Sequence, residues 1–171
     1  MAQYNPPLRD MQFLMHEVLN VPQELQALPP HAEVDGDTIN AVLEEGGKFA
    51  SQVVFPLNRS GDEEGCTHDK ATRSVKTPAG YKEAYQQYVD NGWPALSADS
   101  EYGGQGMPSM LGIMMNELAG TANWSWVMYP GLSHGAVNTV EAHGDAEQKQ
   151  KYLTKLVSGE WTGTMCLTES Q

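Results

Sequence analysis

Apolar residues return at helical spacing along most of the chain. In the first segment, Arg9–Asn20, they occupy positions i, i+3, i+4, i+7 and i+8, which places them on one face of a helix. The same period predicts helices after Asp37 and after Thr77, and another that opens at Pro108. This pattern predicts a domain built almost entirely from helices.

Two further helices are predicted near the C-terminal end. One covers Leu132–His143, and the next begins at Asp145, where the spacing to Gln148 resembles a capping box. Between the earlier helices, residues 58–76 and 93–106 are polar or rich in glycine and are predicted to be long loops.

Two adjacent glycines, Gly46 and Gly47, lie in the middle of the second predicted helix. Each costs on the order of 1 kcal/mol relative to alanine in a helix. Such a cost is typical of a helix that packs closely against a neighbour, or it marks a weak point of the helix.

A different period appears after residue 160. Larger side chains alternate with threonines and Cys166, a period of two that predicts a β-strand over residues 161–168. A single strand leaves its backbone N–H and C=O groups unpaired. We therefore expect either that another chain completes the sheet or that this sequence is the front portion of a longer protein, and we favour the second.

The composition narrows the function classes. The chain has 171 residues and a formal net charge of −12, which argues against binding to nucleic acid or to an anionic membrane surface. No apolar run reaches the ~20 residues of a membrane-spanning helix, and no secretory signal is visible. Cys66 and Cys166 lack a metal-type spacing and are expected to be free thiols in a reducing compartment. We expect a cytoplasmic protein.

No cluster of residues predicts chemistry on its own. His134 and His143 are nine residues apart without accompanying ligands, so a structural or surface role is favoured over metal binding. The Gly103-Gly104-x-Gly106 motif follows no strand, which favours a tight loop over a nucleotide cradle. The methionines at 110–128 fit a helix core better than a ligand cavity. We expect no metal site.

The last thirty residues carry a family resemblance. From His143 to Glu169 the chain reads Gly-x-x-x-Gln-Lys, then Leu-x-x-Gly-Glu, then Cys-Leu-Thr-Glu. This order resembles the acyl-CoA dehydrogenase family, in which it leads into a flavin-binding strand. Residues 92–106, 116–119 and 130–135 are similar as well. The opening resembles the N-terminal extension of the larger bacterial members, which are related to methylthiopropanoyl-CoA dehydrogenase.

The resemblance implies a fold class and a division of the chain. The fold class is all-α, a helical bundle domain of the acyl-CoA dehydrogenase type with a single β-strand at the C-terminal end. Residues 1–34 would form the N-terminal extension and residues 35–160 the helical domain. Residues 161–171 would be the truncated start of a central β-domain.

The resemblance also implies a flavin site. The full-length protein would use FAD to desaturate an acyl-CoA thioester between its α- and β-carbons. Met165, Cys166, Leu167 and Thr168 would bind the cofactor, with the Thr168 hydroxyl near flavin N5. Glu169 belongs to the motif and is not the catalytic base, which lies far downstream in the family.

We therefore expect no catalytic residue in this chain, which alone would be inactive and would not hold FAD tightly. By the same resemblance, Tyr129 and Met128 would line the acyl cavity. The implied partners are an acyl-CoA substrate, an electron-transfer flavoprotein or similar acceptor, and further copies of the chain in a homo-oligomer.

Two alternatives stay open at this point. The unpaired strand equally fits a non-catalytic helical interaction module that pairs its C-terminal strand with another chain. A related flavin oxidase on the same fold would differ only in regions outside this sequence.

Overall fold

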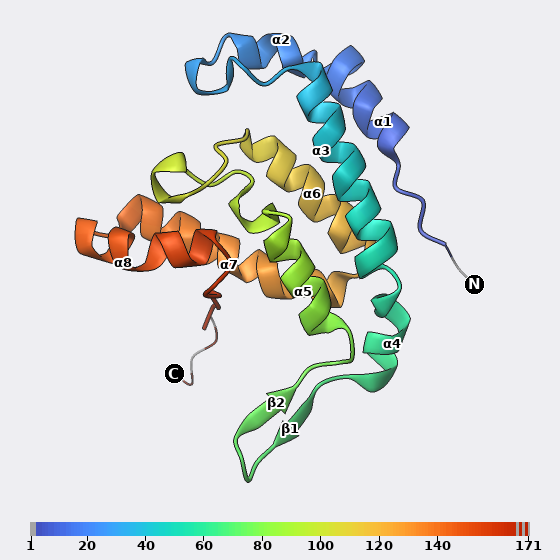
Figure 1. Cartoon of the computed structure of the whole chain (residues 1–171), viewed down its shortest axis with the longest axis vertical. Helices are drawn as coiled ribbons and strands as arrows, with labels where there is room; N and C mark the ends of the chain where they lie inside the picture. The colour runs from blue at the N-terminus through green and yellow to red at the C-terminus, as the bar shows by residue number, and fades with distance from the viewer. Residues whose placement is uncertain (1–2, 167, 169, 171) are drawn as a thin grey trace.

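The computed structural model describes residues 3–166, 168 and 170, and nearly all of their regular structure is helical (Figure 1). The all-α fold class is therefore confirmed. The α-helices are α1 (Leu8–Phe13), α2 (Val21–Gln26), α3 (Gly36–Phe49), α4 (Leu57–Glu64), α5 (Tyr81–Asp90), α6 (Ser109–Ala122), α7 (Trp124–His143) and α8 (Ala146–Val157). Short 3-10 helices cover Pro29–His31, Trp93–Ala95 and Ser100–Tyr102.

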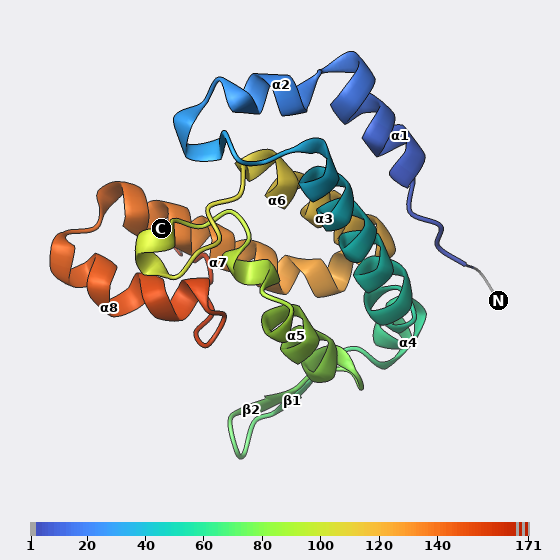
Figure 2. The same ribbon diagram turned by 45° about the horizontal axis from the view of Figure 1, so that its top comes forward.

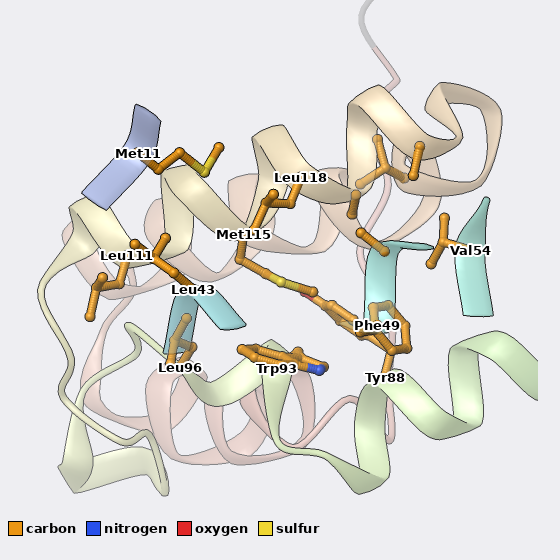
Figure 3. Close-up of a cluster of buried hydrophobic side chains, with 14 of the residues drawn as sticks. Met11, Leu43, Phe49, Val54, Tyr88, Trp93, Leu96, Leu111, Met115 and Leu118 are labelled. Carbon is orange, nitrogen blue, oxygen red and sulfur yellow. The ribbon is translucent and has the colours of Figure 1, made fainter. Parts of the chain in front are cut away.

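The core lies where α3, α5, α6 and α7 meet, and aromatic rings fill its centre (Figure 3). The ring of Phe49 lies 5.9 Å from that of Tyr88 and 5.8 Å from that of Trp126. Trp93 completes the group at 6.4 Å from Phe49. Met115 of α6 is buried beside them, so the interpretation of this methionine as helix core is confirmed.

The two glycines of α3 face two different neighbours. A Cβ on Gly46 would lie 3.0 Å from Met115 Sδ of α6, and a Cβ on Gly47 would lie 3.1 Å from Leu8 of α1. Both positions are therefore sites of close packing, as one of the two interpretations predicted. α6 and the N-terminal extension approach α3 more closely than they could against larger residues.

The N-terminal extension is not one continuous helix, as its apolar period predicts, but several short helical pieces. α1 continues into a π-helical turn, Leu14–Val18, and Asn20 then adopts a left-handed conformation with φ of 49°. The first helical segment ends before Asn20 and not, as predicted, at Pro22; this proline lies in the first turn of α2, where a missing N–H is harmless. Met11 and Met15 hold the extension against the core, and α1 runs alongside α3 in both views (Figure 2).

The region predicted to be a polar loop, residues 58–76, contains regular structure. α4 occupies its first half, and a two-stranded antiparallel hairpin follows, with β1 (Thr67–Asp69) paired to β2 (Ser74–Lys76). The turn is held by Asp69, whose carboxylate accepts the N–H of Ala71 at 2.8 Å. The prediction was wrong because Val75 is the single apolar residue of the strands and the hairpin has no buried face.

α7 begins eight residues earlier than predicted. Asn123 is buried and caps it by accepting the Trp126 N–H at 3.1 Å, and the helix runs through Pro130. A proline inside a helix removes one hydrogen bond. No helix of the described residues is long and apolar enough to cross a membrane.

The strand predicted over residues 161–168 is not formed in the part that can be described. Trp161 lies in a bend, and residues 162–166 have no regular secondary structure. A strand needs a partner for its ladder of hydrogen bonds, and β1 and β2 pair only with each other. Leu167 and Glu169 lie outside the described residues.

Candidate functional site

The segment after α8 folds back over α7 and is fixed at two points. The Gly163 N–H donates to Ser133 Oγ at 3.1 Å, and the Tyr129 hydroxyl donates to Thr162 Oγ1 at 3.3 Å. A Cβ on Gly163 would collide with Ala136. Glycine at 163 therefore lets the backbone of the segment lie directly on the helix.

Trp161 anchors the beginning of this segment on α8. The backbone N–H of Trp161 donates to the backbone carbonyl of Lys155 at 3.0 Å. The Lys155 ammonium lies 4.9 Å from the centre of the Trp161 indole ring. The Tyr152 ring is 6.1 Å away. Lys155 also pairs with Glu160 at 2.7 Å, so the exit from α8 is held by several weak contacts.

The residues predicted to bind flavin follow directly and are open to solvent. Met165 is 60% exposed, and Cys166 and Thr168 are exposed as well. The backbone of residues 164–166 makes no hydrogen bond to another described residue. Leu167, the remaining predicted residue, lies outside the described part of the chain.

An open hollow of about 650 Å³ lies beside this segment, between α7, α8 and the backbone of residues 161–164. Its floor includes Ala136, Val140 and Leu156, and Trp161 forms one wall. The lining combines these apolar side chains with Thr162, Thr164 and Glu160, so the hollow could receive a flat, partly apolar group or another polypeptide segment.

Tyr129 lies next to the segment, but Met128 and Tyr129 are on the outer side of α7, with 44% and 53% of their surfaces exposed. The Tyr129 ring meets Tyr85 edge to face at 5.1 Å, and the Tyr85 hydroxyl donates to the carbonyl of Gly159 at 3.1 Å. Burial raises the pKa of Tyr85 to about 12, so this hydroxyl stays neutral. The structure thus brings Tyr129 to the predicted flavin segment and leaves Met128 apart from it.

The inner side of α7 contains residues that the sequence did not single out for a cavity. Trp126, Pro130 and His134 recur every four residues and point into the domain. Two cavities of about 10 Å³ each, enough for one water molecule, flank His134 and Pro130. The spacing of four along α7 was the signal that could have identified this inner face.

The environment of His134 favours the neutral form of its imidazole. The Tyr88 hydroxyl lies 3.3 Å from Nε2 of His134, and burial lowers the pKa of the imidazole. The preference for a structural or surface role of His134 over metal binding stays a prediction. The nearby Trp93 is buried, and its indole N–H has no hydrogen-bond partner among the described residues.

Metal ligands are not gathered in the described ranges: no group of three or more His, Cys, Asp or Glu could hold an ion there. Cys66 and Cys166 are both exposed and unpaired with each other. The polar groups that line the hollow are the hydroxyls of Tyr152, Thr162 and Thr164 and the carboxylate of Glu160, which is paired with Lys155.

Comparison with known proteins defines the class. Residues 37–160 match the family profile described as "Acyl-CoA dehydrogenase, N-terminal domain". The chain belongs to the acyl-CoA dehydrogenase family, and the resemblance found in the sequence is confirmed.

The relatives refine this assignment. The chain is 39% identical over 98% of its length to 3-methylmercaptopropionyl-CoA dehydrogenase of Ruegeria pomeroyi, which confirms the predicted similarity to this subgroup. It is 32% identical over 95% of its length to a butyryl-CoA dehydrogenase of Syntrophomonas wolfei. It spans only 28% and 27% of these two proteins, respectively.

A solved structure shares the fold. It is described as "Electron transferring flavoprotein of Acidaminococcus fermentans: Towards a mechanism of flavin-based electron bifurcation". The match has a TM-score of 0.62 at 18% identity and covers 78% of this chain and 32% of that chain. At this identity the likeness supports the fold alone.

Proposed function

We propose that this chain is the N-terminal part of an FAD-dependent acyl-CoA dehydrogenase that desaturates an acyl-CoA thioester. The observation that carries the proposal is the family match over residues 37–160, followed closely by residues 164–166, which are exposed and whose backbone makes no hydrogen bond to another described residue. Within this frame, residues 1–34 are the extension, 35–160 the helical domain, and 161–171 the start of the next domain.

The residues of the segment fit a flavin in their chemistry. An isoalloxazine ring needs backbone donors and acceptors along its polar edge and apolar contact on its faces. The backbone of residues 164–166, which has no hydrogen-bond partner among the described residues, the Met165 side chain and the Thr168 hydroxyl are groups of these kinds. We therefore assign Met165, Cys166, Leu167 and Thr168 to the cofactor, with the Thr168 hydroxyl toward N5.

When bound, the flavin supplies the acceptor for the hydride that leaves the β-carbon. The contribution of this chain is positional. The contact of Lys155 with the Trp161 ring and the hydrogen bond of Gly163 to Ser133 fix where the segment leaves the helical domain. Tyr129, bonded to Thr162, would sit where the acyl cavity meets that segment. The base that removes the α-proton would come from outside this chain.

The proposed partners follow from the same assignment. An acyl-CoA thioester is the substrate, an electron-transfer flavoprotein or a similar acceptor reoxidises the cofactor, and the whole protein assembles as a homo-oligomer. Nucleic acid and anionic membranes are not among the proposed partners, because a net charge of −12 disfavours binding to either. A cytoplasmic location stays a prediction.

The test is a pair of assays. This chain alone, supplied with acyl-CoA and an artificial electron acceptor, should show no turnover. The full-length protein should bleach its flavin absorbance when acyl-CoA is added and the acceptor is withheld. Turnover by residues 1–171 alone, or a full-length protein that acyl-CoA does not bleach, would contradict the proposal.

The exposed terminal segment also fits the non-catalytic alternative, in which residues 161–168 add to the sheet of another chain. Light scattering combined with size exclusion separates the two. The alternative requires a stable complex with a separate polypeptide and a full-length protein without flavin.

A further inference from the structure

The N-terminal extension carries an exposed apolar ridge on the side that faces away from its own domain. Its members are Phe13, Leu14, Val18 and Leu19, which are 56%, 46%, 55% and 56% exposed. Contiguous apolar surface of this kind usually marks an interaction site.

The π-helical turn creates this ridge. The Leu19 N–H bonds the carbonyl of Leu14 at 2.9 Å, the i to i+5 pattern of a π-helix, so the two leucines lie one turn apart on the same side. Val18 lies between them. Met11 and Met15, which are 5% and 0% exposed, pack against the domain from the same helical segment. One segment thus has a buried apolar face and an exposed apolar face.

The extension lies outside the part that the family profile matches, which begins at Asp37. Four relatives match 94–99% of this chain and so include most of the extension. The first of these aligns over 168 residues that make up 28% of its length, so it has about 600 residues. The same calculation gives similar lengths for the other three relatives.

Relatives that match about half of this chain or less are much shorter. The bovine isovaleryl-CoA dehydrogenase aligns over 89 residues that make up 21% of its length, so it has about 420 residues. The rice isovaleryl-CoA dehydrogenase aligns over 75 residues that make up 18% of its length, which gives nearly the same total length. The extension, at most 36 residues long, accounts for only a small part of this difference. The long relatives therefore contain well over 100 residues that the short ones lack.

We propose that the ridge of Phe13, Leu14, Val18 and Leu19 is the docking surface for this additional portion of the long polypeptide. The relatives that align over nearly the whole chain, extension included, are the ones that contain the additional portion, so an apolar surface on the extension fits a partner within that portion. This inference rests on the proposed function, in which the chain continues beyond Gln171.

The test is site-specific photo-crosslinking in the full-length protein, with p-benzoylphenylalanine in place of Val18. Position 75 is the matched control, since Val75 is 58% exposed and lies on the hairpin, at the other end of the molecule in Figure 1. We expect position 18 to crosslink, within one chain, to peptides from the portion that the short relatives lack, and position 75 not to reach them. Crosslinks from position 18 only to residues 3–166, only between two copies, or to nothing would overturn the inference.

A second measurement does not depend on the probe. The triple variant Leu14→Ser, Val18→Ser, Leu19→Ser should make the additional portion about ten times more sensitive to limited proteolysis, because its docked state is less populated. The helical domain should keep its circular dichroism, since these side chains are already half exposed. Unchanged proteolysis would count against the inference. A full-length protein that crosslinks as expected but is not bleached by acyl-CoA would contradict the proposed function alone.

Discussion

Gly163 is the residue on which the path of the terminal segment depends most directly. Any Cβ there meets Ala136, and the Gly163 N–H donates to Ser133 Oγ at 3.1 Å. We predict that Gly163→Ala lifts the segment from α7, breaks this hydrogen bond and lowers the free energy of unfolding by about 1 kcal/mol. Hydrogen exchange of the peptide covering residues 158–166 should become faster.

Gly135→Ala is the matched control for this change. Gly135 directly precedes Ala136 on the same helix, and a Cβ there would meet nothing within 4 Å. Alanine is favoured over glycine in a helix by about 1 kcal/mol, so this variant should be as stable as the wild type or more stable. If both variants behave alike, close contact at Gly163 is not what holds the segment.

His134 should make the stability of the domain depend on pH. Burial lowers the pKa of its imidazole in the folded state, while the unfolded value is about 6.5. The unfolded chain therefore binds the proton more readily. The neutral His134 therefore contributes fully to the free energy of unfolding above about pH 6.5. This contribution is lost as the pH falls from there through the pKa of the folded state.

His134→Gln keeps a polar group near Tyr88 but does not titrate. Urea unfolding at pH 7.5 and pH 5.5 should show a smaller loss of stability in this variant than in the wild type. Carboxylates whose pKa is lowered by hydrogen bonds, such as Asp35 and Asp69, respond at more acidic pH and should affect both proteins equally. Equal losses in the two proteins would show that His134 does not carry the dependence.

At the scale of single elements, the clearest local signal is the start of α8. Asp145 accepts the Gln148 N–H at 2.8 Å, and the Gln148 side chain accepts the Asp145 N–H at 3.0 Å, as the capping-box spacing predicted. Asp145→Ala should reduce the free energy of unfolding by about 1 kcal/mol. Glu147→Ala, in the same first turn but outside the box, should cost less, and urea denaturation of the two variants measures the difference.

Elements governed by local pattern were predictable, and those governed by long-range contacts were not. Helix α6 opens after Pro108 as expected, because the proline acts on its own neighbours. α7 extends back past Pro130 because Trp126 and Val127 on its inner face are buried and Asn123 caps its first turn, a benefit that only the folded domain provides. The hairpin after α4 has no apolar face, so no period could reveal it.

The candidate site divides in the same way. The motif around Cys166 identified the family, but it could not tell that residues 161–166 would lack a strand partner within this chain. The family likeness pointed to Met128 and Tyr129, whose side chains lie on the outer side of α7. The inner positions Pro130 and His134 follow from helical spacing only once it is known which face is buried.

For the molecule as a whole, whether the proposed flavin stays bound depends on what covers the terminal segment, residues 161–168. Met165, Cys166 and Thr168 are exposed here, and the hollow beside Trp161 is open to water. A ligand bound on one side only keeps much of its apolar surface hydrated and gains little free energy. We therefore predict that residues 1–171, refolded or expressed with excess FAD, lose the flavin on gel filtration, whereas the full-length protein keeps it. The yellow flavin absorbance in the blue measures the retained fraction. A stoichiometric yellow complex of the short chain would mean that the flavin site is already complete within these residues.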